Sequence, residues 1–240
     1  MSTTAGKVSN LVPVSLPVAR GGVKLQPVAA AADPLSPDLF AAHDPRGVRM
    51  EALRALRAQL LLRWFHENRM LAVVGTRVHD GADVIAANLA IAMAQLGEQT
   101  LLIDADLRRP TVDRRFGLPP GDGLADVLQN CGLCDDALQP VAAIPNLRVL
   151  HAGTAPENSQ ELISRTAFTY LTKSLPDRFD GVIIAAPPSL ECADAQIIAA
   201  RAGGWLLVTR RHRTRLADVA RVKALLEPAR ATLVGGMIHE

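Results

Sequence analysis

Short apolar segments alternate along the chain with amphipathic ones. Runs such as LAVVG, LLIDA, GVIIA and WLLVT contain almost no polar positions, which is typical of strands covered on both faces. We expect strands near residues 70–75, 100–105, 147–151, 181–186, 204–210 and 232–238. We expect helices in the amphipathic segments 81–96, 122–130, 159–175, 193–201 and 215–227. Strand and helix in turn predict an α/β fold, a doubly wound, mostly parallel sheet whose ligand cleft lies at the carboxyl ends of its strands.

The beginning of the chain lacks this alternation. Residues 1–47 are rich in Pro, Ala, Val and Gly and show no periodicity, so we expect a flexible arm, either a plain linker or a docking arm for a partner. The next segment, from Met50 to Phe65, has good helix formers throughout and leucines spaced for one helical face. We therefore expect an N-terminal helix that opens a single folded domain, residues 48–240.

The overall charge and the cysteines limit the function. A net charge of +2 is too small to make nucleic acid or an anionic membrane a default partner, so a basic patch has to be judged locally. Three cysteines, an odd number, and the lack of a signal-like start favour a reducing cytoplasm. No apolar run approaches the roughly 18 residues that span a bilayer. We expect a cytoplasmic protein, and if it works at a membrane, something else brings it there.

The loop between the first sheet strand and its helix reads TRVHDGAD, from Thr76 to Asp83. In a phosphate-binding P-loop, backbone N–H groups at a helix start bind phosphate, a lysine reaches the outer phosphates and a hydroxyl binds magnesium. Counting back from AANLA, these positions fall on Gly81, Ala82 and Asp83, so a methyl group replaces the lysine and a carboxylate the hydroxyl. A phosphate at roughly 4 Å from Asp83 meets repulsion on the order of 4 kcal/mol per charge pair at an effective dielectric constant of about 20. Asp80 is expected to add to it.

Two carboxylates end the second strand, in the segment LLIDADLRRP. Asp104 and Asp106 follow an apolar run at the ligand edge of the sheet, so they are candidates for a residual magnesium site. Arg108 and Arg109 either pair with these carboxylates or recognise a phosphate. The strand GVIIA, by contrast, ends in Ala185, where a Walker B strand places an aspartate. The sequence thus keeps one part of a nucleotide site and lacks the lysine, the hydroxyl and the Walker B aspartate.

The segments EALRALR, AANLA, LLIDADLRRP, VIIAAPP and GMIHE together resemble the bacterial tyrosine kinase family, and most of all the chain-length-determinant tyrosine kinases of exopolysaccharide biosynthesis, over about residues 38–240. The resemblance implies a P-loop NTPase type of fold, in the subgroup of MinD and ParA, with ATP and Mg²⁺ as cofactors. It implies that Asp104 and Asp106 serve magnesium binding and catalysis. It places the nucleotide site at Gly81, Ala82, Asp83, Arg108 and Arg109. The broken first and third motifs, at positions 82, 83 and 185, predict weak or absent nucleotide binding.

The helix motif Glu51, Arg54 and Arg57 matches the residues through which members of that family associate into rings, so the resemblance implies a homo-oligomer. Residues three apart share one broad helix face and can reach a neighbouring subunit. The other interpretation is a solvated face with internal ion pairs. The resemblance also implies a partner, the cytoplasmic part of a membrane chain-length determinant (Wzz-like) protein, with a location peripheral to the inner membrane and no nucleic acid.

Several functions stay open at this point. The first is a cytoplasmic regulator of exopolysaccharide chain length or export that acts by binding, as a pseudokinase with impaired ATP binding and catalysis. The second is an active ATP-dependent protein tyrosine kinase or ATPase that uses Asp104 and Asp106, with an arginine in place of the lysine. A third, a partition or septum-positioning ATPase, shares the fold but does not account for the Glu51 helix. The single tyrosine, Tyr170, falls in a predicted helix, whereas autophosphorylating members of the family carry a tyrosine-rich C-terminal tail.

Other polar residues give weaker signals. Cys131 and Cys134 have the spacing of half a zinc site or of a redox pair, but nothing nearby in sequence completes four ligands. His79 has no nucleophile to serve, and His239 stands where related folds place an asparagine that contacts adenine. A basic cluster that follows one strand is either a solvated loop or a contact for an acidic partner or an anion; it consists of Arg210, Arg211, His212, Arg213 and Arg215.

Overall fold

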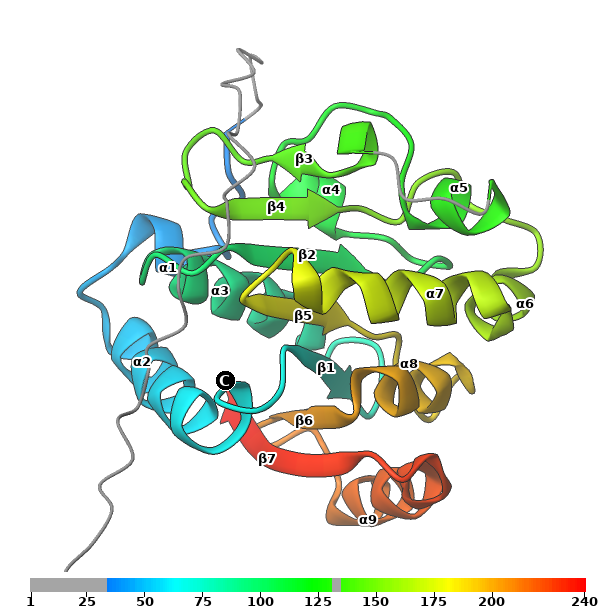
Figure 1. The fold of residues 1–240 in the computed structure, drawn as a ribbon. Coiled ribbons are helices and arrows are strands. Elements are labelled where there is room, and N and C mark those ends of the chain that lie inside the picture. Colours follow the sequence, from blue (N-terminus) through cyan, green and yellow to red (C-terminus); the bar gives the residue numbers. More distant parts are fainter. Residues whose placement is uncertain (1–33, 131–134) are drawn as a thin grey trace, which may run out of the picture.

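The protein, seen in a computed structural model that describes residues 34–130 and 135–240, is built around one sheet. Its strands in these ranges are β1 (Met70–Gly75), β2 (Thr100–Asp104), β3 (Gln139–Pro140), β4 (Leu147–Leu150), β5 (Gly181–Ala185), β6 (Gly204–Arg210) and β7 (Thr232–His239). Their order is β3-β4-β2-β5-β1-β6-β7, and all neighbours are parallel except β3 and β4 (Figure 1). All but β3 coincide with predicted segments, so the doubly wound, mostly parallel sheet is confirmed.

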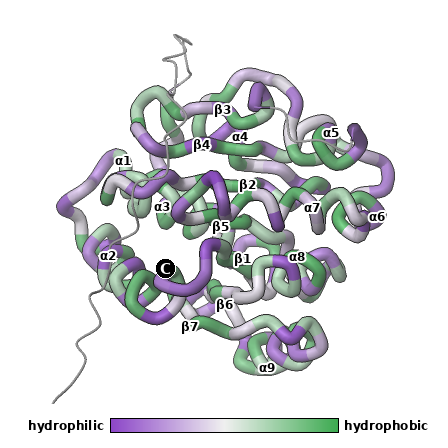
Figure 2. Tube along the Cα trace, in the orientation of Figure 1, coloured by the Kyte–Doolittle hydropathy of each residue, from purple (hydrophilic) through white to green (hydrophobic). Residues whose placement is uncertain are grey.

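Successive residues of the central strands enter two separate cores. In β1, Leu71 and Val73 belong to one core, whereas Ala72 and Val74 belong to the other, and all four are fully buried. Both faces of the strand therefore need apolar side chains, which is why these runs show no polar alternation. The central strands accordingly carry mainly the hydrophobic colour in Figure 2.

Helices cover both faces of the sheet (Figure 1). One face carries α1 (Phe40–His43), α2 (Val48–Leu60) and α3 (Ala82–Ala94); the other carries α5 (Leu124–Gln129), α6 (Ser159–Ser164), α7 (Thr166–Ser174), α8 (Asp194–Ala202) and α9 (Leu216–Leu226). Helix α3 lies between the sheet and α1 and α2, which explains why nearly all of its residues are apolar and buried. Among the helices described, none combines the length and the apolar character needed to cross a bilayer.

The helices depart from the prediction in a few places. The segment 159–175 is interrupted at Arg165, whose extended backbone (φ −66°, ψ 155°) separates α6 from α7. The predicted helix from Met50 to Phe65 is α-helical only as far as Leu60 and continues as a π-helical turn, Leu61–Phe65. Strand β3, helix α1 and helix α4 (Val112–Arg115) have two to four residues, too few for a hydrophobic period to show in the sequence.

The segment that begins at Pro34 packs on the domain. Leu39, Phe40 and Ala41 are buried, and the Ala41 N–H donates to Asn88 Oδ1 of α3 at 2.8 Å. The guanidinium of Arg49 lies over the Phe40 ring, 5.1 Å from its centroid. The folded part therefore starts before residue 48, and residues 34–47 are not part of a free arm. Residues 1–33 lie outside the described residues, so the rest of the arm stays a prediction.

Candidate functional site

A cavity of about 920 Å³ opens at the carboxyl ends of β1, β2 and β5. Parallel strands bring the loops that follow them to one edge of the sheet, which is the usual ligand position in this architecture. Its wall contains most of the residues that the sequence singles out: Gly81, Ala82, Asp83, Asp104, Asp106 and Arg109. Arg108 lies outside this wall. The cavity is therefore where the sequence places the nucleotide site.

The loop before α3 is held by one of its own side chains. Asp80 Oδ2 accepts hydrogen bonds from the Thr76 N–H at 2.9 Å, the Thr76 hydroxyl at 2.5 Å and the Arg77 N–H at 3.1 Å. Asp80 Oδ1 accepts one from Thr214 Oγ1 at 2.9 Å. This carboxylate is buried and does not line the cavity. The expectation that Asp80 confronts a bound phosphate is therefore wrong, because its charge is directed into the loop.

Gly81, the residue before α3, has a left-handed backbone with φ +74°, which favours glycine. A Cβ at this position would lie 2.7 Å from the ring of His239. The His239 Nε2–H donates to the carbonyl oxygen of Asp80. The histidine at the end of β7 therefore supports the loop from outside, and its ring is engaged with the protein.

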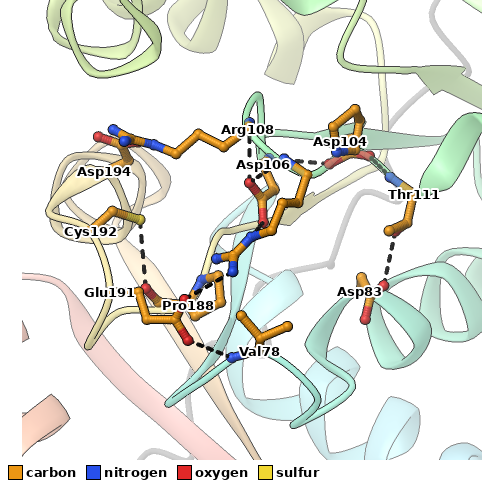
Figure 3. A network of polar contacts seen from close by, with 12 residues as sticks. Val78, Asp83, Asp104, Asp106, Arg108, Thr111, Pro188, Glu191, Cys192 and Asp194 are labelled. Carbon is orange, nitrogen blue, oxygen red and sulfur yellow. Dashed lines mark hydrogen bonds and ion pairs between the residues drawn. The ribbon is translucent and has the colours of Figure 1, made fainter. Parts of the chain in front are cut away.

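Asp83 lies in the first turn of α3 and is paired within the molecule. Its Oδ2 is 2.6 Å from Arg115 Nη2 and accepts a hydrogen bond from Thr111 Oγ1 at 2.9 Å (Figure 3 shows the Thr111 bond). Arg115 also pairs with Asp38 of the N-terminal segment. The positive end of the helix and the guanidinium both stabilise the negative charge of Asp83. No sequence motif marks Arg115 or Asp38, so this pairing could not be found from the sequence.

The carboxylate of Asp104 is buried under the loop that follows β2. Its Oδ1 accepts a hydrogen bond from the Asp106 N–H at 3.1 Å, and its Oδ2 accepts two, from the Thr111 and Val112 N–H groups at 3.0 and 3.1 Å. Burial raises the pKa of Asp104 to about 7, although the three hydrogen bonds act in the opposite direction. Both oxygens are thus engaged in holding the shape of this loop.

Asp106 continues the same loop. Its Oδ1 accepts hydrogen bonds from the Arg108 and Arg109 N–H groups at 3.2 and 3.0 Å. Burial raises the pKa of Asp106, against the effect of these hydrogen bonds and of the Arg109 charge. In the described ranges, no group of three or more His, Cys, Asp or Glu side chains is arranged to hold a metal ion. Asp104 and Asp106 therefore lack a third ligand of these types.

Arg108 and Arg109 were expected either to pair with Asp104 and Asp106 or to recognise a phosphate. Both pair with carboxylates, but only Arg109 reaches one of the expected two, and their main partners were not predicted. Figure 3 shows Arg108 directed toward Asp194. Arg109 Nη1 lies 2.9 Å from Glu191 Oε2, while its Nε is 3.9 Å from Asp106 Oδ2. Arg108 Nη2 lies 3.2 Å from Oδ2 of Asp194, which is almost fully buried at the start of α8. The carboxylates after β5 therefore neutralise both arginines.

Glu191 connects this ion pair to the loop before α3. Its Oε1 accepts a hydrogen bond from the Val78 N–H at 3.0 Å (Figure 3). The pKa of Glu191 lies below its usual value. Partial burial acts to raise this pKa, but the hydrogen bond from the Val78 N–H and the charge of Arg109 together outweigh it. One carboxylate thus links the loops that follow β1, β2 and β5.

The end of β5 carries no acidic side chain. Ala185 and Ala186 stand there, both buried, with Ala185 beside Asp104 in the register of β2 and β5. The Cys192 thiol in the following loop has a pKa raised to about 11, chiefly by burial. Cys131 and Cys134 lie outside the described residues. Tyr170 lies on α7 and is 71% exposed.

The motif of α2 makes contacts within the chain. Arg54 Nη1 lies 3.1 Å from Glu51 Oε2, and the same guanidinium reaches the carbonyl oxygen of Pro45. Arg57 Nη1 donates to the carbonyl oxygen of Ala92 in α3 at 2.7 Å, and burial lowers the pKa of this arginine. Glu51 is exposed and Arg54 partly so, which leaves these two available to another surface, whereas Arg57 is turned toward α3.

Known proteins resemble this chain in both sequence and structure. YwqD, a tyrosine-protein kinase of Bacillus subtilis, is 33% identical over 204 residues, which cover 84% of this chain and 85% of YwqD. The kinase domain of the Escherichia coli tyrosine kinase ETK has a TM-score of 0.79 at 28% identity, covering 84% of this chain and 79% of that one. MinD of Pyrococcus horikoshii, solved with Mg-ADP, shares the fold, with a TM-score of 0.62 and 23% identity over 71% of this chain and 70% of that one. No protein-family model matches the chain.

The sequence likeness to YwqD spans most of both chains. The ETK kinase domain resembles this chain in the arrangement of its sheet and helices. The structure of MinD agrees with the type of fold that the sequence resemblance implies. The chain belongs to the bacterial tyrosine kinase family.

Proposed function

We propose that this chain is a catalytically impaired member of its family, a pseudokinase that regulates exopolysaccharide chain length or export by binding other proteins. The observation that carries the proposal is Asp83, a carboxylate at the helix start where phosphoryl transfer requires a hydroxyl on magnesium. Arg115 and Thr111 hold this carboxylate in place, so moving it away from a bound phosphate would break an ion pair and a hydrogen bond.

The residues of the cavity do not fit Mg-ATP, the cofactor of the family. Ala82 offers a methyl group where a lysine would neutralise the outer phosphates, and Ala185 offers no side-chain oxygen at the end of β5. Arg109, a cavity arginine that also pairs with Asp106, is bound to Glu191 at 2.9 Å. Phosphoryl transfer depends on positioning and charge neutralisation, and none of these three positions supplies them.

Isothermal titration with Mg-ATP tests the proposal. We expect no binding at nucleotide concentrations up to about 1 mM, which corresponds to a binding free energy weaker than roughly −4 kcal/mol. The double variant Ala82→Lys, Asp83→Ser restores the lysine and the hydroxyl and should gain affinity, whereas Ala224→Lys, which adds a lysine on the exposed side of α9, should not. Micromolar binding with steady turnover by the unaltered chain would refute the proposal.

The proposed regulator assembles through α2 and docks, peripheral to the inner membrane, on the cytoplasmic part of a Wzz-like chain-length determinant. The exposed Glu51 and the partly exposed Arg54 support a contact with a second subunit. Light scattering should give a lower mass for Glu51→Ala, Arg54→Ala than for the unaltered chain. The matched control Arg63→Ala, Glu67→Ala, in the π-helical turn and just after it, should leave the mass unchanged. Equal masses for all three proteins would remove α2 from the proposal.

A second candidate, an active tyrosine kinase or ATPase, has one observation in its favour. Asp104 lines the cavity and its pKa is raised to about 7, in the range where a carboxylate can take a proton at neutral pH. Transfer of radiolabelled phosphate decides between the two candidates. A signal that disappears in Asp104→Asn and Asp106→Asn supports the enzyme, and an equal background in all three proteins dismisses it.

A further inference from the structure

The segment after β6 concentrates positive charge on one part of the surface. Between Arg210 and Arg221 the sequence has five arginines and one aspartate, which give +4 without His212. The whole chain carries +2, so the remaining residues sum to −2. The small overall charge therefore conceals a strongly basic surface.

Among the described residues, few of these charges take part in ion pairs. The aspartate of the segment, Asp218, pairs with Arg77 at 3.0 Å, and Arg211 lies 3.6 Å from Glu240. In the part of the chain that the structure describes, no ion pair is made by three further exposed arginines, Arg213, Arg215 and Arg221. Arg215 and Arg221 lie near enough to Asp218 to help lower its pKa, after the larger effect of Arg77, but their exposed guanidinium groups remain open to an anionic partner.

Helix α9 extends this surface with an outward side that carries no acidic residue. Val222 and Leu226 point into the core, whereas the exposed positions are Leu216, Ala217, Ala220, Arg221, Lys223 and Ala224. Leu216, directly after Arg215, is 86% exposed. Basic side chains mixed with small and apolar ones, and an uncovered leucine among them, are typical of segments that lie in a membrane interface. We call the set Arg211, His212, Arg213, Arg215, Leu216, Arg221 and Lys223 the α9 surface.

We propose that the α9 surface binds the anionic headgroups of a phospholipid bilayer directly, with Leu216 inserted at headgroup level. Clusters of four to eight basic residues suffice for such binding, and each arginine near the surface strengthens it roughly five-fold. The arginines complement the negative charge of anionic headgroups. The exposed Leu216 lies directly beside them, and a bilayer offers both an anionic surface and an apolar interior. The proposal is independent of the proposed function, in which a partner protein makes the membrane contact.

Direct contact would also orient the cavity. Arg210, the first residue of the basic segment, lines the cavity, and its Nη1 donates to the carbonyl oxygen of His79 in the loop before α3 at 3.4 Å. The Arg211 N–H donates to the carbonyl oxygen of His239 at 2.7 Å, which fixes the start of the basic loop at the same edge of the sheet. A bilayer on the α9 surface would therefore lie beside the mouth of the cavity.

Vesicle sedimentation with the full chain tests the proposal. The protein should sediment with vesicles of phosphatidylcholine and phosphatidylglycerol and not with phosphatidylcholine alone. Raising the salt from about 0.1 M to about 1 M shortens the Debye length from roughly 10 Å to 3 Å and should release most of the protein. Loss of binding in Arg213→Glu, Arg215→Glu by at least about 25-fold is expected, because two charges are reversed.

Two further variants separate a specific surface from net charge. Leu216→Ser removes the apolar contact, keeps every arginine and should weaken binding several-fold. Arg63→Glu, Lys173→Glu reverses two exposed charges elsewhere and should stay within about three-fold of the unaltered chain. The proposal is overturned if the unaltered chain ignores anionic vesicles, if this control loses as much as the Arg213, Arg215 variant, or if the chain binds polyglutamate and not lipid.

Discussion

The substitution Asp104→Asn should change how the stability of the protein depends on pH. Burial raises the pKa of this carboxyl to about 7, although three backbone N–H groups donate to it. The asparagine side chain keeps nearly the same shape and has no charge at any pH. A comparison of the two proteins therefore isolates the cost of the buried charge.

The sign of the effect follows from the direction of the pKa shift. In the unfolded chain the group titrates near its ordinary value of 3.8, whereas in the folded chain it holds its proton up to about pH 7. Between these values the folded state binds more protons than the unfolded state, so the free energy of unfolding falls as the pH rises. A shift of about 3 units corresponds to about 4 kcal/mol, lost progressively between about pH 4 and pH 7.

The asparagine has its own cost, which does not depend on pH. Its amide oxygen can accept the two hydrogen bonds that Thr111 and Val112 donate to Oδ2, but its NH₂ group then faces the Asp106 N–H. One unsatisfied buried donor costs about 1–3 kcal/mol. The variant should be less stable than the unaltered protein by about this amount near pH 4, and as stable or more stable at pH 8.

Urea unfolding at pH 5, 6, 7 and 8 measures the difference, with fluorescence of the buried Trp64 and Trp205 as the signal. This window contains about two units of the slope, so the difference between the two proteins should change by about 3 kcal/mol. The control Asp44→Asn, at an exposed site, should follow the unaltered protein at every pH. Parallel curves for the unaltered protein and Asp104→Asn would show that the fold does not raise this pKa.

Three other substitutions test the contacts around the cavity. Arg115→Met should destabilise the fold by about 1–3 kcal/mol in urea unfolding, since it leaves two partly exposed carboxylates without their cation. Asp83→Asn in the same chain should recover part of the loss, and additive effects would contradict the pairing. Glu191→Gln should speed hydrogen exchange of the backbone amides in the loop before α3, while the free energy of unfolding changes by less than about 1 kcal/mol. Unaltered exchange would show that the glutamate does not hold this loop. Gly81→Ala should lower the free energy of unfolding by about 1–3 kcal/mol. Adding His239→Ala to this variant should remove the clash between the new Cβ and the histidine ring, but not the strain of an alanine in a left-handed backbone. Complete recovery of stability would show that this backbone carries no strain.

The strands could be predicted from the sequence because burial on both faces leaves a direct trace in composition. Apolar runs such as Val182 to Ile184 admit no polar residue, since each side chain enters one of the two cores. Short elements leave no such trace. The α1 segment, with Phe40 and Ala41, was missed because its burial depends on α3, which is distant in sequence and presents Asn88 to it.

The candidate site divides in the same way. The residues of the loops after β1 and β2 could be named because each motif lies within one stretch of sequence at a known edge of the sheet. Arg115, Glu191 and Asp194 could not be named, since their roles arise from contacts between loops that follow different elements. Asp80 was placed at the right edge, but the direction of its carboxylate depends on Thr214, more than a hundred residues away.

On the proposed function, in which the site does not serve a nucleotide, charge matching within the site explains how the fold keeps a cavity of this kind. In a working site the carboxylate and arginine positions meet a cation and phosphates, and binding adds to stability through mass action. Here Asp83 meets Arg115, and Arg109 meets Glu191, so the folded chain supplies both counter-charges itself. Arg115 also accepts, at its carbonyl oxygen, a hydrogen bond from the Ser36 N–H at 2.8 Å. The segment that begins at Pro34 is thereby tied to the cavity. A partner that displaced this segment would remove its contacts with Arg115, and Arg115 is the residue that pairs with Asp83.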